Sequence, residues 1–594
     1  MAAITADQKR PGEPEVIAYT DAEKAGGVAM PAGGHRDSKD GNGSDSDEFQ
    51  EGVRNMRAIT TIWTKKTLWT MFGLLYLISF VDYLQNAVDS ALSPYVTSAF
   101  KSHGLLNIAS ILSTIMGGCA PLALAKLIDI WGRVEGFVFM LLVCVVGTIL
   151  KAVSNNVSTY VAGGTLYWTG HIGVRYVIGV LLADMTSLKN RMIFIGFSAT
   201  PRIATAFAGP AIGKLFLEQV NFRWAFGAFA ILLIASCVPA IVLLSMMNRK
   251  ALREGIIEKR PASGRTMLQS FKFYAIEFDI LGILILMFAL SFLLLPFSLA
   301  SRAPQQWRTP YIIALIVLGV LLLPVFYIWE AKFAPKQFLP FHYLKQGTII
   351  GSSLLVGTMY LSCFTWNAYF YSYLLIVHRQ PIDTAGYIVN TFMLTAAFFA
   401  PIVGFVISYT GDFKWTAYAG VPIMLLGTAL IIPFRSPSAP VGMLVFTQFL
   451  VGLGSEIFTA CSTLAIMAPV THQYIAAVNA IGGLFGSVGA AIGFAIAGAM
   501  WNNMVPQELT NRLPEGLKGN ASAIFADINI QGSFADGSPE REAVVGAYSH
   551  VMRLMVIVGA AFMPLCVLCV FAWKNINVKK IEEEQGKQTK GNTI

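Results

Sequence analysis

A short charged stretch, Lys126-Leu127-Ile128-Asp129-Ile130-Trp131-Gly132-Arg133, lies between two long apolar segments. Of the 594 residues, 55% are hydrophobic and only 13% are charged, as in a membrane protein, so this loop is expected at the membrane surface. Gly132 suits a tight turn, because glycine adopts backbone angles that other residues avoid. Asp129 and Arg133 can tie the ends of neighbouring helices together. We predict that Asp129, Gly132 and Arg133 form a gate; an ordinary polar turn is the alternative.

The apolar segments predict the fold class. A helix needs about 20 apolar residues to cross a bilayer. Fourteen segments meet this requirement, so we predict an all-α membrane protein with 14 transmembrane helices. They lie near residues 68–92, 105–125, 134–152, 157–182, 191–215, 224–247, 279–300, 310–329, 348–375, 384–408, 415–434, 441–465, 475–501 and 545–573.

The basic residues predict the orientation of these helices. Arg54, Arg57, Lys65 and Lys66 precede the first segment, and the long loop near 249–276 is also basic. Since cytoplasmic loops carry an excess of Lys and Arg, we place this loop, both termini and the gate on the cytoplasmic side. No signal peptide is visible before the first apolar run.

Composition and motifs exclude several function classes. The net charge of +9 comes from residues that flank apolar segments, so no nucleic-acid partner is expected. All 7 Cys residues fall in apolar segments, which argues against a disulfide framework or a metal site. The sequence Gly209-x-x-x-Gly213-Lys214 is one residue too short for a phosphate-binding loop. Without a nucleophile and base arrangement either, the chain is predicted not to be an enzyme.

A weak internal repeat predicts the organisation of the chain. Asp129 precedes Arg175 by about as many residues as Asp412 precedes Glu456 in the second half. We therefore predict two six-helix halves with a helix pair inserted between them. The predicted parts are a disordered cytoplasmic tail at 1–66, an N-terminal half at 67–248, a cytoplasmic loop at 249–276, the inserted pair at 277–330, a C-terminal half at 331–574 with a long outer loop at 502–544, and a cytoplasmic tail at 575–594.

Four ionisable residues inside the apolar segments are candidates for proton coupling, because such groups are costly to bury. Asp82 and Asp89 share one face of the first helix, and a desolvated Asp82 can hold a proton near neutral pH. Arg175 and Glu456 occupy equivalent positions in the two halves. The alternatives are an acid at the outer helix end for Asp89, and an ion pair that only locks helices for Arg175 and Glu456.

Aromatic residues near the outer side are candidates for substrate binding, since aromatic surfaces with hydroxyl groups suit a bulky, partly polar ligand. An aromatic belt at the membrane interface is the alternative. Ser538 is expected to cap the last helix, with Pro539 in its first turn. Asn520 lies in an Asn-Ala-Ser glycosylation sequence of the outer loop. The substrate-binding candidates are Trp366, Tyr369, Phe370, Tyr373 and Tyr548.

The charged loop resembles the loop between the second and third helices of the major facilitator superfamily, G-x-L-A-D-x-x-G-R. Asp129, Gly132 and Arg133 match this pattern, whereas Ala125 replaces its first Gly and Ile130 replaces the basic residue after Asp. The sequence from Arg175 to Gly179 resembles the fourth-helix motif that this superfamily associates with proton coupling.

Residues 60–575 as a whole resemble the fungal siderophore–iron transporters, a fourteen-span branch of the superfamily. The segments that carry this resemblance are 80–82, 92–100, 125–133, 183–191 and 222–226. The resemblance implies proton-coupled import of ferric siderophores of the hydroxamate type across the fungal plasma membrane, or from endosomal vesicles.

Iron that arrives already chelated needs no protein ligands, so no metal site and no cofactor are expected. The expected partners are a ferric siderophore, protons and the lipid bilayer, with the protein as a monomer. The alternative is a fourteen-span, proton-coupled exporter or exchanger of drugs or glutathione. A nutrient sensor is disfavoured, because the two tails are short.

Overall fold

Helices make up almost all of the described chain. The computed structural model describes residue 59 and residues 62–100, 106–186, 188–257, 266–300, 303–335, 341–470 and 475–580. This part contains no β-strand beyond one isolated bridge between Asp412 and Asn577. The predicted all-α class is confirmed. Most of the predicted tails, 1–66 and 575–594, lies outside the described residues.

The first half is a bundle of long helices. Asn156 and Asn221 cap the starts of two of them, α5 and α8, with their side-chain oxygens. Gly147 lets α4 and α5 approach closely, since a Cβ atom there would lie 2.1 Å from the amide nitrogen of Tyr167. The helices are α2 (Lys65–Ala99), α3 (Leu106–Ile130), α4 (Arg133–Ala152), α5 (Val157–Met185), α6 (Leu188–Ala199), α7 (Pro201–Gln219) and α8 (Phe222–Arg253).

The fifth predicted span is a broken helix. The sequence predicts one span near 191–215, whereas the structure has α6 and α7 separated at Thr200. Pro201 begins α7, and proline lacks the amide N–H that a continuous helix requires. In the described chain, 13 helices are long and apolar enough to cross a membrane, and neither α6 nor α7 is among them. The predicted count of 14 is therefore not confirmed.

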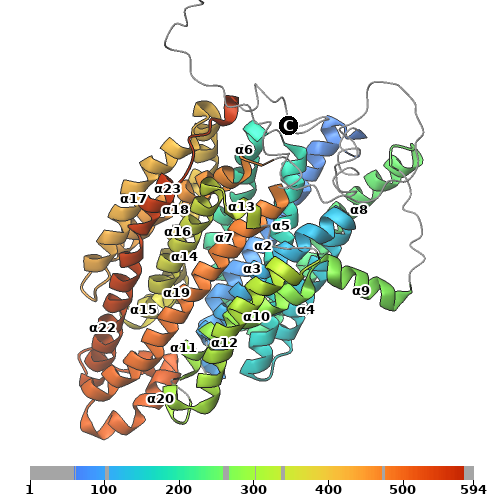
Figure 1. Ribbon diagram of the computed structural model, residues 1–594. Coiled ribbons are helices and arrows are strands. Elements are labelled where there is room, and N and C mark those ends of the chain that lie inside the picture. The colour runs from blue at the N-terminus through green and yellow to red at the C-terminus, as the bar shows by residue number, and fades with distance from the viewer. Residues whose placement is uncertain are drawn as a thin grey trace, which may run out of the picture. The chain divides into compact units, whose positions relative to one another are not determined.

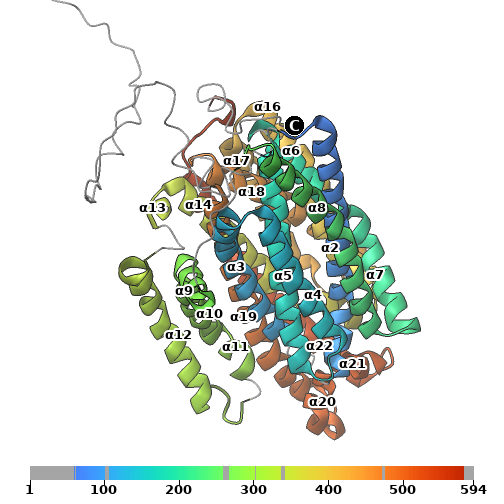
Figure 2. The ribbon, with the colours of Figure 1, turned by 90° about the vertical axis from the view of Figure 1, so that its right-hand side faces the viewer.

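A helix pair follows the first half, as predicted. Figure 2 shows it at one side of the bundle, where α10 packs against α3. Asp279 caps α10 and accepts a hydrogen bond from the indole of Trp329 at 2.9 Å, which ties the two ends of the pair together. Its elements are α9 (Met267–Glu277), α10 (Ile280–Leu294), α11 (Pro296–Leu299), η3 (Gln306–Arg308), α12 (Pro310–Ile328) and η4 (Trp329–Phe333).

The second half repeats the arrangement of the first. Gly489 lets α19 approach α14, because a Cβ atom there would lie 2.0 Å from the carbonyl oxygen of Gly357. The long helices and their extensions are α13 (Phe341–Leu344), α14 (Gly347–Asn367), α15 (Phe370–Ile376), α16 (Ile382–Thr410), α17 (Phe413–Phe434), α18 (Val441–Met467), α19 (Ile475–Arg512), α22 (Pro539–Phe562) and α23 (Leu565–Phe571).

The two ends of the bundle differ. One end, at the top of Figure 1, holds the start of α2 and the end of α23, and we call it the terminal end. The other end holds residues 513–538, which we call the cap. The predicted loop 502–544 is shorter and more ordered than expected, since α19 runs on to Arg512 and α22 begins at Pro539. The cap contains η6 (Glu515–Asn520), α20 (Ala521–Ala526) and α21 (Ile528–Ser533).

The two halves meet along a surface that we call the seam. Helix α3 packs against α19, and α6 and α7 pack against α16. The side chain of Asn390 in α16 donates to the carbonyl oxygen of Ala206 in α7 at 3.0 Å. Nearer the cap end, Lys214 and Asp383 form an ion pair of 3.7 Å between the same two helices. The broken fifth span thus supplies one side of the seam.

Candidate functional site

Two arginines share one tyrosine ring at the seam. The guanidinium carbon of Arg175 in α5 lies 4.3 Å from the centroid of the Tyr83 ring in α2. The guanidinium carbon of Arg202 in α7 lies 4.4 Å from the same centroid. A ring face attracts a cation, which holds both side chains in place. Arg175 was singled out from the sequence, whereas Arg202, two residues after the break at Thr200, was missed.

The second half faces this pair of arginines with Tyr360 of α14 and Glu456 of α18. Arg202 interacts electrostatically with both of these side chains, and Arg175 interacts with Tyr360. Arg202 also reaches the sulfur of Met393 in α16 at 3.6 Å. All four side chains are half-buried; Arg175, Tyr360 and Glu456 lie within their helices, and Arg202 lies in the first turn of α7. The structure therefore brings Arg175 and Glu456 to the same part of the seam, with Arg202 between the halves.

Asp82 is paired with a histidine deep in the first half. Its Oδ1 lies 2.7 Å from Nδ1 of His171 in α5, and the two residues are only 1% and 4% exposed. The ring of Trp168 lies 5.0 Å from that of His171. The second carboxylate oxygen of Asp82 has no hydrogen-bond partner among the described residues. The role of Asp82 in proton coupling stays a prediction.

Asp89 forms an ion pair with Lys151 of α4. The ammonium group of Lys151 also lies 5.0 Å from the ring centroid of Tyr160 and 4.5 Å from that of Phe226. This pair ties α2 to α4 near the cap end and is set apart from the two arginines. Its place near the cap end fits the alternative for Asp89, an acid at the outer helix end, while its role in proton coupling stays a prediction.

The charged loop forms a tight turn whose ion pair lies within the first half. Gly132 has a φ of 121°, a backbone conformation that favours glycine, as the sequence predicts. Arg133 at the start of α4 donates to Asp184 at the end of α5 at 3.1 Å and to the carbonyl oxygen of Ile128 at 3.1 Å. The side chain of Asp129 lies outside the described part of the structure. The gating role of Asp129, Gly132 and Arg133 stays a prediction.

The same loop also contacts α9 and the residue that follows it. The ring of Trp131 meets those of Tyr274 and Phe278 edge-on, with centroids 5.0 and 6.1 Å apart. Lys126 donates to the carbonyl oxygen of Glu277 at 3.2 Å. These contacts attach the inserted pair to the first half, a link that the spacing of the residues does not reveal.

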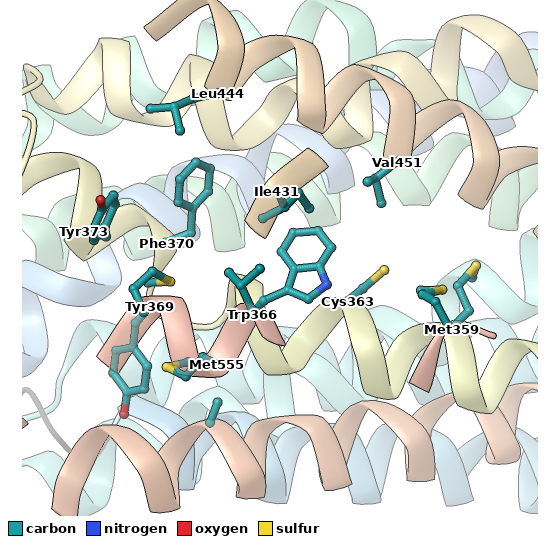
Figure 3. Close-up of a cluster of buried hydrophobic side chains, with 14 of the residues drawn as sticks. Met359, Cys363, Trp366, Tyr369, Phe370, Tyr373, Ile431, Leu444, Val451 and Met555 are labelled. Atoms are coloured by element: carbon teal, nitrogen blue, oxygen red, sulfur yellow. The ribbon is translucent and has the colours of Figure 1, made fainter. Parts of the chain in front are cut away.

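The predicted aromatic face of the ninth span is turned into the core of the second half. Figure 3 shows Trp366, Phe370 and Tyr373 among apolar side chains of neighbouring helices. Tyr369 stacks on Trp501 of α19 with a centroid distance of 4.3 Å and an interplanar angle of 8°. All four predicted residues are at most 1% exposed, so in this conformation they contact protein atoms on all sides. None of the four side chains has exposed surface here, so their predicted role in substrate binding would require the core to open.

A buried arginine that the sequence analysis missed lies beside these rings. Nη1 of Arg435, just beyond α17, donates to the carbonyl oxygen of Trp366 at 2.5 Å. Its guanidinium carbon lies 3.7 Å from the ring centroid of Phe370. The contact spans the interruption between α14 and α15, where regular helix hydrogen bonding stops. Arg435 follows an apolar segment, so its position in the sequence predicts a residue at the membrane surface.

Tyr548 connects the last helix to the cap. Ser538 caps α22 and Pro539 occupies its first turn, which confirms that prediction. Ten residues on, the Tyr548 hydroxyl donates to the side chain of Gln531 in α21, and its ring meets that of Trp501 edge-on. Tyr548 is fully buried. It therefore fastens the cap in this conformation, and its predicted contact with a ligand stays a prediction.

Charged contacts hold the cap to the connection between α15 and α16. Asp536 of the cap forms ion pairs with Arg379 at 2.9 Å and Arg541 at 3.6 Å. Arg541 also donates to the carbonyl oxygen of Val377 at 3.3 Å. Burial lowers the pKa of the neighbouring His378, because its charged form is less well solvated there. The cap is thus part of the second half, although α21 also touches α2.

Asn520, the predicted glycosylation site, ends η6 at the cap end and is exposed. Ser522 of the same Asn-Ala-Ser sequence is also exposed, in the first turn of α20. The geometry leaves the side chain accessible, which a glycosylation site requires, and its modification stays a prediction.

Comparison with known proteins agrees with the family that the sequence resembles. Residues 75–300 match the Major Facilitator Superfamily. The chain is 51% identical to MFS siderochrome iron transporter 1 of Ajellomyces capsulatus, over 93% of this chain and 96% of that relative. It is 38% identical to siderophore iron transporter mirB of Emericella nidulans, over 91% and 90% of the two chains. A third relative, MFS siderochrome iron transporter 1 of Gibberella zeae, is 36% identical over 96% and 94%.

Solved structures support the fold alone. A crystal structure of the peptide transporter POT in complex with sulfate aligns with a TM-score of 0.53 and 15% identity, over 88% of this chain and 99% of that one. A bacterial homologue of the human lysosomal transporter Spinster aligns with a TM-score of 0.50 and 14% identity, over 86% and 97%. With its helical repeat, its charged loop and relatives that match nearly its whole length, the chain belongs to the fungal siderophore–iron transporters of the major facilitator superfamily.

Proposed function

We propose that this protein imports ferric siderophores together with protons. The observation that carries the proposal is the 51% identity to a siderochrome iron transporter over 96% of that relative's length. A transporter of this kind moves its cargo unchanged and is not an enzyme.

The ligand binds at the seam in this proposal, between Arg175 and Arg202 of the first half and Tyr360 and Glu456 of the second. These side chains come from both halves, so relative movement of the halves would expose the site to each end in turn. They offer hydrogen-bond donors and an aromatic ring, but no set of soft or imidazole ligands for bare iron. A ferric siderophore of the hydroxamate type carries its iron ligands with it, so the protein needs none and no cofactor.

Protons cross through the Asp82–His171 pair, with Arg175 and Glu456 as the charged groups nearest to the ligand. Asp82 and Arg175 interact electrostatically, so the two functions communicate within the first half. Protonation of Asp82 removes a negative charge beside Arg175 and strengthens the field that an approaching ligand meets. Proton uptake and ligand binding then favour each other, as symport requires.

The cap end faces outward and the terminal end faces the cytoplasm. The basic segments that precede α2 and α9 support this orientation, as does the accessible Asn520 at the cap end. The protein acts as a monomer in the plasma membrane or in endosomal vesicles. For entry from outside, the contact of α7 with α16, including the Lys214–Asp383 pair, must open. The loop at Asp129, Gly132 and Arg133 gates the opposite side.

The experiment that tests import against export measures radiolabelled iron uptake from a panel of ferric siderophores in fungal cells that lack their own importers. We expect uptake of at least one siderophore, above that of cells with the empty vector. Absence of uptake from the whole panel, together with gained resistance to drugs or altered glutathione release, would contradict import and support the exporter alternative.

A further inference from the structure

The two arginines at Tyr83 lack a carboxylate partner of their own. Within the described chain, neither Arg175 nor Arg202 forms an ion pair with an acid. Both contact the ring of Tyr83, and Arg202 also contacts the sulfur of Met393. Their guanidinium groups share one ring, so the two positive charges lie close together. Like charges at this separation repel, and the repulsion is stronger away from bulk water.

Neither acid nearby forms an ion pair with these arginines in the described chain. Asp82 acts on Arg175 electrostatically, but its Oδ1 bonds His171 and its Oδ2 has no hydrogen-bond partner among the described residues. Glu456 interacts electrostatically with Arg202 from the other half, but no hydrogen bond or ion pair joins the two side chains among the described residues. Charged groups in the middle of a membrane protein are costly unless they are paired or line a substrate path. The arginines remain half-buried at the seam.

We infer that Arg175 and Arg202 form an anion site, and that the preferred ferric siderophore carries an ionised carboxylate on its organic frame. This inference rests on the proposed transport function and names the substrate class of the same site. A guanidinium group binds a carboxylate through two parallel hydrogen bonds, and Tyr83 holds both groups in position for it. Three hydroxamates cancel the charge of ferric iron, so a simple ferric trihydroxamate is neutral and leaves the arginines unpaired.

A matched series of ferric complexes tests the inference. The starting compound is a linear trihydroxamate that ends in a free amine. Acetylation of the amine gives a neutral ferric complex of the same frame, and succinylation gives a complex that ends in a carboxylate. Uptake of each radiolabelled ferric complex is measured in cells that lack other importers. We expect the carboxylate form to be taken up with an apparent affinity about tenfold higher than the acetylated form.

Substitutions assign the preference to the arginines. Arg202→Gln and Arg175→Gln should each abolish the preference for the carboxylate form, and Arg202→Lys should restore part of it. Arg308→Gln, an exposed arginine between α11 and α12, is the matched control and should keep the preference. Equal affinity of the wild type for the neutral and carboxylate forms would overturn the inference, as would a preference that survives both glutamine variants.

Failure of the transport proposal has a different signature, namely no uptake of any ferric complex by the wild type. The anion site is then judged on purified protein, by tryptophan fluorescence titration with the metal-free succinylated and acetylated compounds. Tighter binding of the succinylated compound that Arg202→Gln abolishes would support the site. Absence of binding, or binding that ignores the carboxylate, would remove it.

Discussion

Nδ1 of His171 lies 2.7 Å from Oδ1 of Asp82, joining α5 to α2 inside the first half. The ring of Tyr83, the next residue of α2, contacts the guanidinium groups of Arg175 and Arg202 at the seam. The proposed proton site and the proposed ligand site therefore share one turn of α2. A movement of this turn, or a change in the charge of Asp82, would therefore act directly on the proposed ligand site.

Removal of the charge at Asp82 should uncouple transport from protons. Asp82→Asn keeps the shape of the side chain but cannot bind a proton, so we predict a loss of uptake of about tenfold or more, and the loss of its dependence on external pH. His171→Gln should shift the pH profile of uptake, since it keeps a hydrogen-bonding group but not a titrating one. Uptake by Asp82→Asn with a normal pH profile would show that the proton travels elsewhere.

Sequence alone identified Asp82 but not its partner. An acid within an apolar segment stands out because burial of a charge is costly. His171 is separated from it by 89 residues, and their contact depends on how α2 and α5 pack. The packing is set by many apolar contacts, none of which marks a particular pair in the sequence.

The Arg133–Asp184 pair should stabilise the first half. Both side chains are buried, so Arg133→Gln leaves a buried carboxylate without this partner and should lower the free energy of unfolding by about 3–5 kcal/mol. Adding Asp184→Asn removes the second charge and should recover much of that loss. Thermal unfolding of the purified single and double variants measures both effects. Additive losses in the double variant would show that the two residues act independently.

Tyr548 should act through the packing of the cap. Tyr548→Phe removes its hydrogen bond to Gln531 and should cost about 1 kcal/mol of stability. Tyr548→Ala leaves a cavity beside Trp501 and should cost about 3–5 kcal/mol. Thermal unfolding should rank the wild type above Phe and Phe above Ala, with Tyr311→Ala on the exposed face of α12 as the control. A large loss of siderophore affinity in Tyr548→Phe, at normal stability, would restore the ligand contact predicted from the sequence.

Asn520 should carry a glycan if the cap end faces outward. Asn520→Gln and Ser522→Ala should each give the same faster electrophoretic band, and treatment of the wild type with an endoglycosidase should reproduce it. Asn511→Gln, an exposed asparagine outside a glycosylation sequence, is the matched control. A wild-type band that is unchanged by the enzyme would contradict modification at this site.

The rest of the site shows where sequence reasoning stops. The apolar segments predicted the helices because length and hydropathy are local properties. Arg202 was missed because it follows Pro201 inside a segment that reads as continuous, and the break decides where its side chain lies. The aromatic face of the ninth span was assigned to a ligand because periodicity shows that residues share a face, but does not show which neighbour that face meets. In the structure it meets α19 and α22.

Transport by the purified protein in liposomes tests the central claim most directly. The protein is reconstituted into vesicles, an inward proton gradient is imposed by a pH jump, and accumulation of a radiolabelled ferric siderophore is followed with and without an uncoupler. The account predicts accumulation above the external concentration that requires both the protein and the gradient, and that the uncoupler abolishes. Accumulation that is equal with and without the gradient would contradict proton coupling, and no protein-dependent uptake of any ferric siderophore would contradict the proposed function.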